Sequence, residues 1–316
     1  MSNSNCIIVL LVLIPVLLVG NVYAEYPKRP INYMVCFNPY GESDIIARAQ
    51  KEPLEDILSV DVLVTYKIGG GGSVGWSELV KANPDGYIVA GYNIPHIIVQ
   101  PLIRENPRYE TKEIQPIYTF VFTPDILVVR KESDIKNLED FIKYAKENPG
   151  SITVGGSGSY GANHMGALEF NQAAGIKTTY IPFTGSGEAV PSLLGGHVTA
   201  LMTYTTMGIL FSDKMRVLAV ASDERVEALS GVPTFKELGY DIVEGAYRGI
   251  AGPPGMPKDK VDILSKAFYK VNQMPDFRNK HKKLGFKIVD YGPEESKELV
   301  KEKIDFYKGI LKKLGL

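Results

Sequence analysis

Cysteine and histidine are scarce in this chain of 316 residues, which holds two cysteines and four histidines. Cys6 lies in the N-terminal segment described below, so Cys36 is the one cysteine of the remaining chain and has no internal disulfide partner. The histidines are scattered without zinc-ligand spacing, so no metal and no cofactor is expected. The formal net charge of −1 provides no basic surface for nucleic acid or an anionic membrane.

Charged side chains are absent from the first 24 residues. Cys6–Gly20 is an apolar run of 15 residues broken by Pro15, which is short for a membrane span. Val22-Tyr23-Ala24 resembles the small-residue pattern of a signal-peptidase site. We therefore predict a signal peptide over residues 1–24, cleaved after Ala24, and an exported protein in the periplasm or at the cell surface. A retained N-terminal anchor is the alternative, because no Lys or Arg precedes the apolar run.

Strand-like apolar runs alternate with helical segments in the rest of the chain, which predicts an α/β fold. The chain length suggests two domains. We expect the chain to cross between two lobes in the extended runs Ile117–Val129 and Asp241–Gly252. The predicted strands are Ile31–Val35, Val60–Tyr66, Tyr87–Gly91, Ile126–Arg130, Ile152–Gly155, Thr178–Ile181, Thr199–Thr203 and Val217–Ala221.

Local signals place helices between these strands. Pro293 is expected to begin a C-terminal helix, since its fixed φ suits a first turn. Pro53 is expected to end or kink the helix after Asp44, near Glu52, because proline has no N–H group to donate. Three further helices are expected after a capping side chain: Leu138–Glu147 after Asn137, His164–Ala174 after Asn163, and a short helix after Ser186 that ends at Gly195.

Glycine and hydroxyl residues combine in four loops at predicted strand-to-helix junctions. Glycine lets backbone N–H groups approach a ligand closely, and a helix N-terminus favours negative charge. Each loop alone is also compatible with a tight turn. Four of them in one exported α/β chain predict an anion-binding cleft. These loops are Asn38–Asp44, Gly69–Gly75, Gly155–His164 and Thr184–Gly187.

Two of the loops also match motifs of other protein classes. Gly156–Gly161 fits G-x-G-x-x-G, but the acid that a dinucleotide site needs about 20 residues later is absent. Gly71–Gly75 fits G-x-S-x-G, the nucleophile elbow, with Ser73 as the nucleophile. An exported serine esterase therefore stays as an alternative, although the downstream histidines are poorly placed to complete a triad.

Ordered motifs along nearly the whole chain resemble one protein family. No single motif is diagnostic, but the ordered set is specific. It comprises Tyr26-Pro27-x-Arg29-Pro30, Phe37-x-Pro39-x-Gly41-x-x-Asp44, Gly69–Gly75, Pro84-Asp85-Gly86-Tyr87, Gly155-x-Ser157-Gly158 with His164, Pro182-Phe183-x-Gly185-Ser186, Leu193–Gly196, Arg216-x-Leu218, Val232-Pro233-Thr234 and Pro253-x-Gly255-x-Pro257. The chain resembles the substrate-binding proteins of tripartite tricarboxylate transporters, the Bug family of periplasmic receptors.

The resemblance implies a two-lobed, type II periplasmic-binding-protein (Venus-flytrap) fold that closes on a small organic acid. The implied lobes are residues 25–123 plus 248–316 and residues 124–247. The resemblance further implies a monomeric receptor and not an enzyme. Such a receptor binds a mono-, di- or tricarboxylate, with or without an amino group, and delivers it to integral-membrane permease subunits. A receptor that binds the same ligand for sensing and not for uptake is a further alternative.

In the family, the ligand carboxylate is held largely by backbone amides and bridging waters of two strand–helix loops. Paired helix N-termini supply such donors without a buried cation. Carried over to this sequence, the candidate ligand-binding residues are Phe37, Asn38, Tyr40, Gly41, Glu42, Ser43, Asp44, Ser157, Gly158, Tyr160, Gly161, Ala162, Asn163, His164, Thr184, Gly185, Ser186, Thr203, Tyr204, Thr205 and Arg248.

The chain departs from the family pattern at several positions. Where this chain has Glu42, Tyr40, Thr203 and Cys36, the family usually has a small hydroxyl residue, a glycine, an acid and a proline, respectively. We expect Cys36 to be buried. Glu42 either faces solvent and supports the first helical turn, or contacts an ammonium or hydroxyl group of the ligand while Tyr40 narrows the pocket. Arg248 either binds a distal carboxylate or forms a structural ion pair between the lobes.

Overall fold

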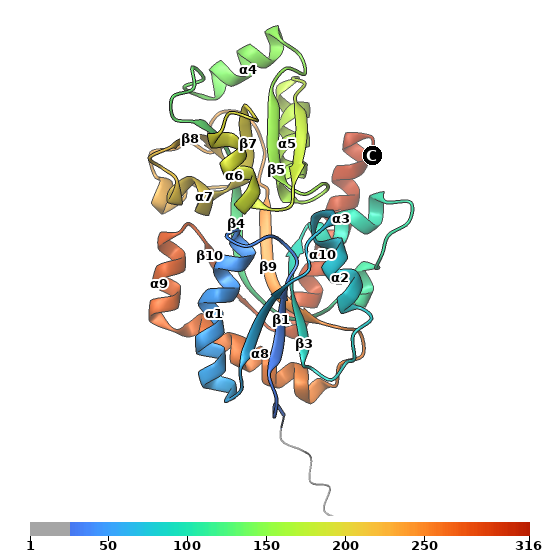
Figure 1. The fold of residues 1–316 in the computed structure, drawn as a ribbon. Coiled ribbons are helices and arrows are strands. Elements are labelled where there is room, and N and C mark those ends of the chain that lie inside the picture. The colour runs from blue at the N-terminus through green and yellow to red at the C-terminus, as the bar shows by residue number, and fades with distance from the viewer. Residues whose placement is uncertain (1–25) are drawn as a thin grey trace, which may run out of the picture.

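The structure is a computed structural model that describes residues 26–316 as an α/β protein with two lobes (Figure 1). The predicted signal peptide and its cleavage site lie outside the described residues. None of the helices in residues 26–316 combines the length and apolar character needed to cross a membrane.

Ten strands and ten α-helices follow one another within residues 26–316, and all of the predicted strands are present. The strands are β1 Ile31–Val35, β2 Val62–Tyr66, β3 Ile88–Ile94, β4 Gln115–Arg130, β5 Thr153–Ser157, β6 Thr179–Phe183, β7 Ala200–Tyr204, β8 Met215–Val220, β9 Gly245–Gly252 and β10 Lys287–Tyr291. The helices are α1 Glu42–Leu58, α2 Ser73–Leu79, α3 His96–Ile103, α4 Leu138–Glu147, α5 Ala162–Ala174, α6 Ser186–Leu194, α7 Thr205–Leu210, α8 Lys258–Gln273, α9 Pro275–Lys283 and α10 Pro293–Leu314.

Strand β4 joins the two lobes because it is 16 residues long and changes partners along its length. Its first part pairs with β9 and β10, in the lobe that also holds the parallel strands β1, β2 and β3. From Asp125 onward it pairs with β7 and β8, in the lobe that holds the parallel strands β5 and β6. The strand order is β2-β1-β3-β9-β4-β7-β5-β6, with β8 and β10 also paired to β4.

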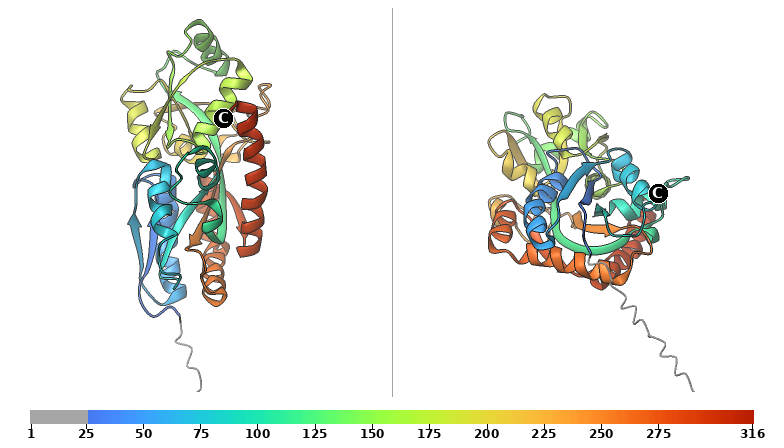
Figure 2. Two further views of the ribbon diagram at one scale, coloured as in Figure 1. Left: turned by 90° about the vertical axis from the view of Figure 1, so that its right-hand side faces the viewer. Right: turned by 60° about the horizontal axis from the view of Figure 1, so that its bottom comes forward.

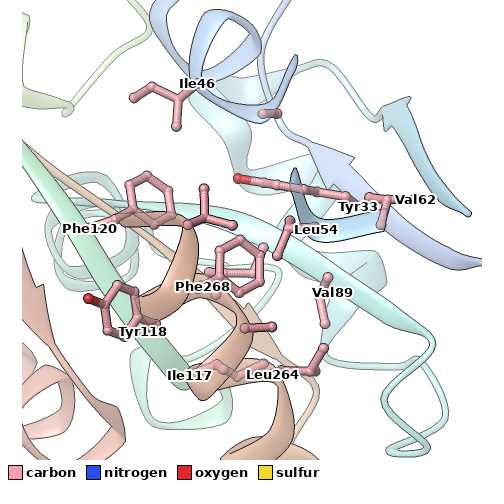
Figure 3. Close-up of a cluster of buried hydrophobic side chains, with 14 of the residues drawn as sticks. Tyr33, Ile46, Leu54, Val62, Val89, Ile117, Tyr118, Phe120, Leu264 and Phe268 are labelled. Carbon is pink, nitrogen blue, oxygen red and sulfur yellow. The ribbon is translucent and has the colours of Figure 1, made fainter. Parts of the chain in front are cut away.

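The first lobe is built around a core between its sheet and helices α1 and α8 (Figure 3). Tyr33 packs edge-on against Phe268, with ring centroids 6.0 Å apart, and Phe120 stacks on the same ring. Ile46 and Leu54 of α1 are buried on the sheet-facing side of the helix. Burial of these large side chains is the main favourable term for the lobe.

Other parts of the core lie in the second lobe and under the C-terminal helix. Phe170 of α5 packs between Phe141 and Phe235 in the second lobe. Helix α10 begins at Pro293 as predicted and buries Tyr307 and Leu311. The helix runs along the side of the molecule from one lobe to the other (Figure 2).

The prediction that the first helix ends or kinks at Pro53 is wrong, because α1 continues through it to Leu58. Beyond the proline, Leu54 and Leu58 are both buried in the core of the first lobe. Their packing offsets the single hydrogen bond that proline cannot donate.

Of the three predicted caps, one is confirmed. The Asn137 side chain accepts a hydrogen bond of 2.8 Å from the N–H of Asp140 at the start of α4. Helix α5 instead follows Gly161, with Asn163 inside its first turn, and α6 follows Gly185, one residue before the predicted Ser186. The Asn163 amide turns toward neighbouring strand ends, where it has stronger partners than its own helix offers.

Leu54→Ala is expected to destabilise the protein by about 2–5 kcal/mol, because it leaves a cavity where α1 packs on the sheet. Chemical denaturation followed by circular dichroism would measure the change. Glu52→Ala, two residues away on the exposed side of the helix, is the matched control and should change stability by less than about 0.5 kcal/mol. Equal effects of the two substitutions would contradict the continuous, anchored helix.

Candidate functional site

A narrow cavity of about 10 Å³ lies between the two lobes in this closed form. The first lobe contributes the start of α1 and the strands β3 and β9. The second lobe contributes the ends of β5 and β7 and the start of α6. Its lining residues are Phe37, Gly41, Glu42, Ser43, Asn93, Ser157, Gly185, Ser186, Tyr204 and Arg248.

A larger groove lies elsewhere, between residues 222–227 of the second lobe and residues 282–287 of the first. Its charged side chains are largely paired, for example Lys282 with Glu227 at 2.8 Å. None of the glycine loops predicted to bind an anion borders it. The narrow cavity is therefore the candidate site.

Helices α1 and α6 both begin at the cavity, one from each lobe. Their N-caps are Gly41 and Gly185, neither of which offers a side-chain hydrogen bond to the first turn. The first N–H groups of an α-helix have no partner within the helix and carry partial positive charge. The cavity thus lies between two helix starts whose backbone N–H groups can donate to an anion. Such an arrangement is suited to binding a carboxylate.

Glycine is required where the two helix starts approach each other. A methyl group on Gly187 would overlap the carbonyl oxygen of Pro39, and one on Gly185 would overlap the Asn38 amide. Backbones from the two lobes are therefore in direct contact, and the lobes are closed over the cavity.

A buried ion pair forms one wall of the cavity. Glu42, the first residue of α1, contacts Arg248 of β9, and each residue is only 2% exposed. The interpretation that Glu42 faces solvent is therefore wrong. Arg248 also donates a hydrogen bond of 2.7 Å to Thr123 and lies over the Tyr204 ring, 4.3 Å from its centroid.

Burial sets the titration of the acids near this pair. It raises the pKa of Glu42, and the charge of Arg248 partly offsets the rise. It raises the pKa of Asp125 well above its usual range, with Glu42 adding to the effect and Arg248 opposing it. Asn163, a predicted ligand residue, donates a hydrogen bond of 3.0 Å to Asp125. Asn163 therefore supports the cavity wall from behind.

Tyr40 and Asp44, two predicted site residues, lie outside the cavity lining. The Tyr40 side chain is 81% exposed and does not line the cavity. It therefore does not narrow the pocket. Asp44 is buried but accepts hydrogen bonds from Tyr40 N at 2.7 Å, from Arg48 at 2.7 Å and from Tyr66 at 2.6 Å. Asp44 therefore holds the loop in shape.

The glycine loop after β5 reaches the cavity only through Ser157. The N–H of Tyr160 donates to His164, whose ring stacks on Tyr180 with centroids 4.1 Å apart. Gly158 packs against the backbone of Gly71. Ala162 is fully buried at the start of α5.

Two of the three predicted threonines make structural hydrogen bonds, and the third is buried without one among the residues that the structure describes. Thr184 donates its N–H and hydroxyl to Glu188 in the first turn of α6. The Thr205 hydroxyl donates to the carbonyl of Gly285, a contact of 3.0 Å between the lobes. The Thr203 hydroxyl is buried on β7, behind the cavity lining.

Asn93 and His96 are site residues that the sequence did not indicate. Asn93 lines the cavity from β3. The buried His96 ring packs edge-on against Phe37 and against Gly161 of the other lobe, where a methyl group would overlap it. Burial, and then the nearby charge of Arg248, lower the pKa of His96 to about 3, so the ring is neutral in the closed protein. Asn93 lies near the end of β3 and His96 begins α3, and neither belongs to a local motif.

Residues 46–316 match the family model described as the tripartite tricarboxylate transporter family receptor. The chain belongs to this receptor family. A UPF0065 protein of Cupriavidus necator is 30% identical, over 92% of this chain and 89% of the relative. The protein BugT of Bordetella pertussis is 26% identical, over 92% of this chain and 90% of BugT.

Solved structures have the same fold as this receptor. The periplasmic binding protein BugD matches with a TM-score of 0.87 and 31% identity, over 92% of this chain and 99% of BugD. MatC of Rhodopseudomonas palustris, solved with bound malate, matches with a TM-score of 0.85 and 23% identity, over 90% of this chain and 100% of MatC. The resemblance and the two-lobed periplasmic-binding-protein fold are therefore confirmed.

Arg248→Met is expected to destabilise the receptor at pH 7 by about 3–5 kcal/mol, because it leaves Glu42 buried without its cation. Loss of that cation raises the Glu42 pKa in the folded state further above its unfolded value. A group of this kind gives its full stability below the unfolded pKa, near 4.5, and loses it as the pH rises. The deficit should therefore be small at pH 4 and grow toward pH 8.

Denaturant midpoints of the wild type and the variant between pH 4 and pH 8 would measure this deficit. The double variant Glu42→Gln/Arg248→Met carries neither charge and should recover most of the stability at pH 7. A deficit that is independent of pH, or that the second substitution fails to relieve, would show that the ion pair is not its cause.

Proposed function

We propose that the receptor holds one small carboxylate between the starts of α1 and α6 and passes it to a membrane permease. The observation that carries this proposal is the pair of facing helix starts, each after a glycine N-cap that offers the first-turn N–H groups no side-chain acceptor. Malate in MatC, and adipate in a second Rhodopseudomonas palustris protein of this fold, are ligands of the same chemical class.

Binding is proposed to favour closure because the ligand contacts both lobes. A ligand that touches both halves stabilises only the closed state, so it shifts the equilibrium toward closure. The division into residues 25–123 plus 248–316 and residues 124–247 stays a proposal. The change of partner at Asp125 of β4 supports its first boundary, whereas the pairing of Gly245 with Pro124 favours a return a few residues before Arg248.

The family implies export and a membrane transporter partner. A monomeric receptor released by cleavage after Ala24 is our proposal for the mature form. In the closed receptor the two lobes form one continuous surface, which an open receptor lacks. A permease that binds this surface would select the ligand-bound receptor.

The esterase alternative rests on Ser73, which is buried at the start of α2. Within residues 26–316, the hydrogen bond that its hydroxyl makes comes from Arg104, at 2.8 Å. A nucleophilic serine needs a general base in hydrogen-bonding reach. The contact with a guanidinium, which cannot accept a proton, favours a structural role for Ser73.

Thermal shifts against a panel of mono-, di- and tricarboxylates and amino acids test the receptor proposal. At about a hundred times its dissociation constant, a ligand should stabilise the protein by roughly 2.7 kcal/mol, enough to raise the Tm measurably. Native mass spectrometry of freshly purified protein would identify a ligand that co-purifies. The Ser73→Ala variant should show the same ligand-induced rise in Tm as the wild type. If no acid binds, and if the wild type cleaves an ester that Ser73→Ala does not, the esterase alternative holds.

Gly187→Ala is expected to weaken binding of whichever acid scores in that panel by at least about tenfold. The substitution suits the helix, but the added methyl group would overlap Pro39 and keep the lobes from closing. Isothermal titration would measure the loss. Gly309→Ala, in an exposed and open position of α10, is the control that should leave affinity unchanged. Undiminished affinity in Gly187→Ala would contradict closure at this contact.

A further inference from the structure

The ion pair in the cavity wall leaves two hydrogen-bonding atoms unused. Glu42 Oε1 and Arg248 Nε are buried, and neither has a hydrogen-bond partner among the described residues. Both side chains line the cavity. Burying a polar atom without a partner costs free energy, so native structures usually supply one. A purely structural ion pair gives no account of the open acceptor on Glu42, whereas a bound cation does.

Thr206 is the neighbouring group that comes nearest to satisfying Glu42. Its hydroxyl lies close enough to the carboxylate to lower the pKa of Glu42. The two groups nevertheless lack hydrogen-bonding geometry, and the Thr206 hydroxyl is itself buried without a partner. The acceptor on Glu42 thus stays open toward the cavity.

The charges around the cavity restrict what the ligand carries. Among the lining residues that the structure describes, Arg248 is the one base and Glu42 the one acid. Arg248 is already paired, so no free cation remains for a second carboxylate. A second negative charge would instead meet Glu42 in a site of low dielectric, where repulsion between like charges is strong.

Building on the proposed function, we propose that this receptor selects an amine-bearing carboxylate, with the ligand ammonium on Glu42 and the carboxylate at the starts of α1 and α6. Arg248 is the positioning residue, since it holds Glu42 ionised and fixed against the cavity. A zwitterion carries both charges that the cavity can match and adds no net charge to a buried neutral pair.

Matched pairs of acids with and without the amino group test this proposal. Isothermal titration of the purified exported protein would compare L-alanine with propionate, L-aspartate with succinate, and L-glutamate with glutarate. In at least one pair, the amino acid should bind at least about tenfold more tightly than its analogue, because only the amino acid supplies a cation to Glu42.

Glu42→Gln should remove that preference. The amide keeps the size of the side chain but loses its charge, so the amino acid should bind at least about tenfold more weakly, while the analogue lacking the amine changes little or improves. Glu52→Gln, on the exposed side of the same helix, is the matched control. If Glu42→Gln unfolds because Arg248 loses its partner, Glu42→Gln/Arg248→Met removes both charges and should show the same loss of preference.

The outcomes separate this proposal from the proposed function. If an analogue without the amine binds wild type as tightly as its amino acid, the ligand class is wrong and the carboxylate receptor stands. Persistence of the preference in Glu42→Gln would assign it to another residue and overturn the role of Glu42. If none of these acids binds but another acid of the thermal-shift panel does, the ligand class is wrong and the receptor stands; if nothing in that panel binds, both proposals fall.

Discussion

The buried guanidinium of Arg248 is the interaction on which the arrangement of the cleft depends. It pairs with Glu42 at the start of α1, donates to Thr123 on β4, and lies over the Tyr204 ring of the second lobe. One planar group thereby connects the first helix, the strand shared by both lobes and the far wall of the cavity. Arginine suits this position because its fork of donors is rigid and it stays charged when buried.

Much of the remaining cavity wall comes from residues at two helix starts. Two helices begin there after glycine caps, and the loops that lead into them touch across the cleft at Gly185 and Gly187. A carboxylate site made from main-chain donors tolerates side-chain change around it. On our proposal, Glu42 sets which acid this receptor accepts without any change in the main-chain donors.

Sequence reasoning recovered the fold and the loops that meet at the cleft, because glycine and proline motifs record backbone geometry. It named Glu42 and Arg248 as candidate site residues, each with a structural alternative, but did not pair them with each other, since nothing local connects residues so distant in the chain. It also predicted that Tyr40 narrows the pocket, whereas the loop turns this side chain into solvent. His96 carries no motif, and only packing against Gly161 reveals its place. At Pro53, tertiary packing overrode a local rule.

Helix α10 places a mechanical limit on how the receptor opens. It lies alongside both lobes (Figure 2), with Tyr307 bonded to Glu244 at 2.9 Å and the carbonyl of Lys313 accepting from Gln172 of α5 at 2.9 Å. A helix of 22 residues is a stiff rod of about 33 Å. These contacts tie the second lobe to α10 along one flank, so a separation of the lobes that keeps them would widen the opposite flank, where α1 and α6 meet.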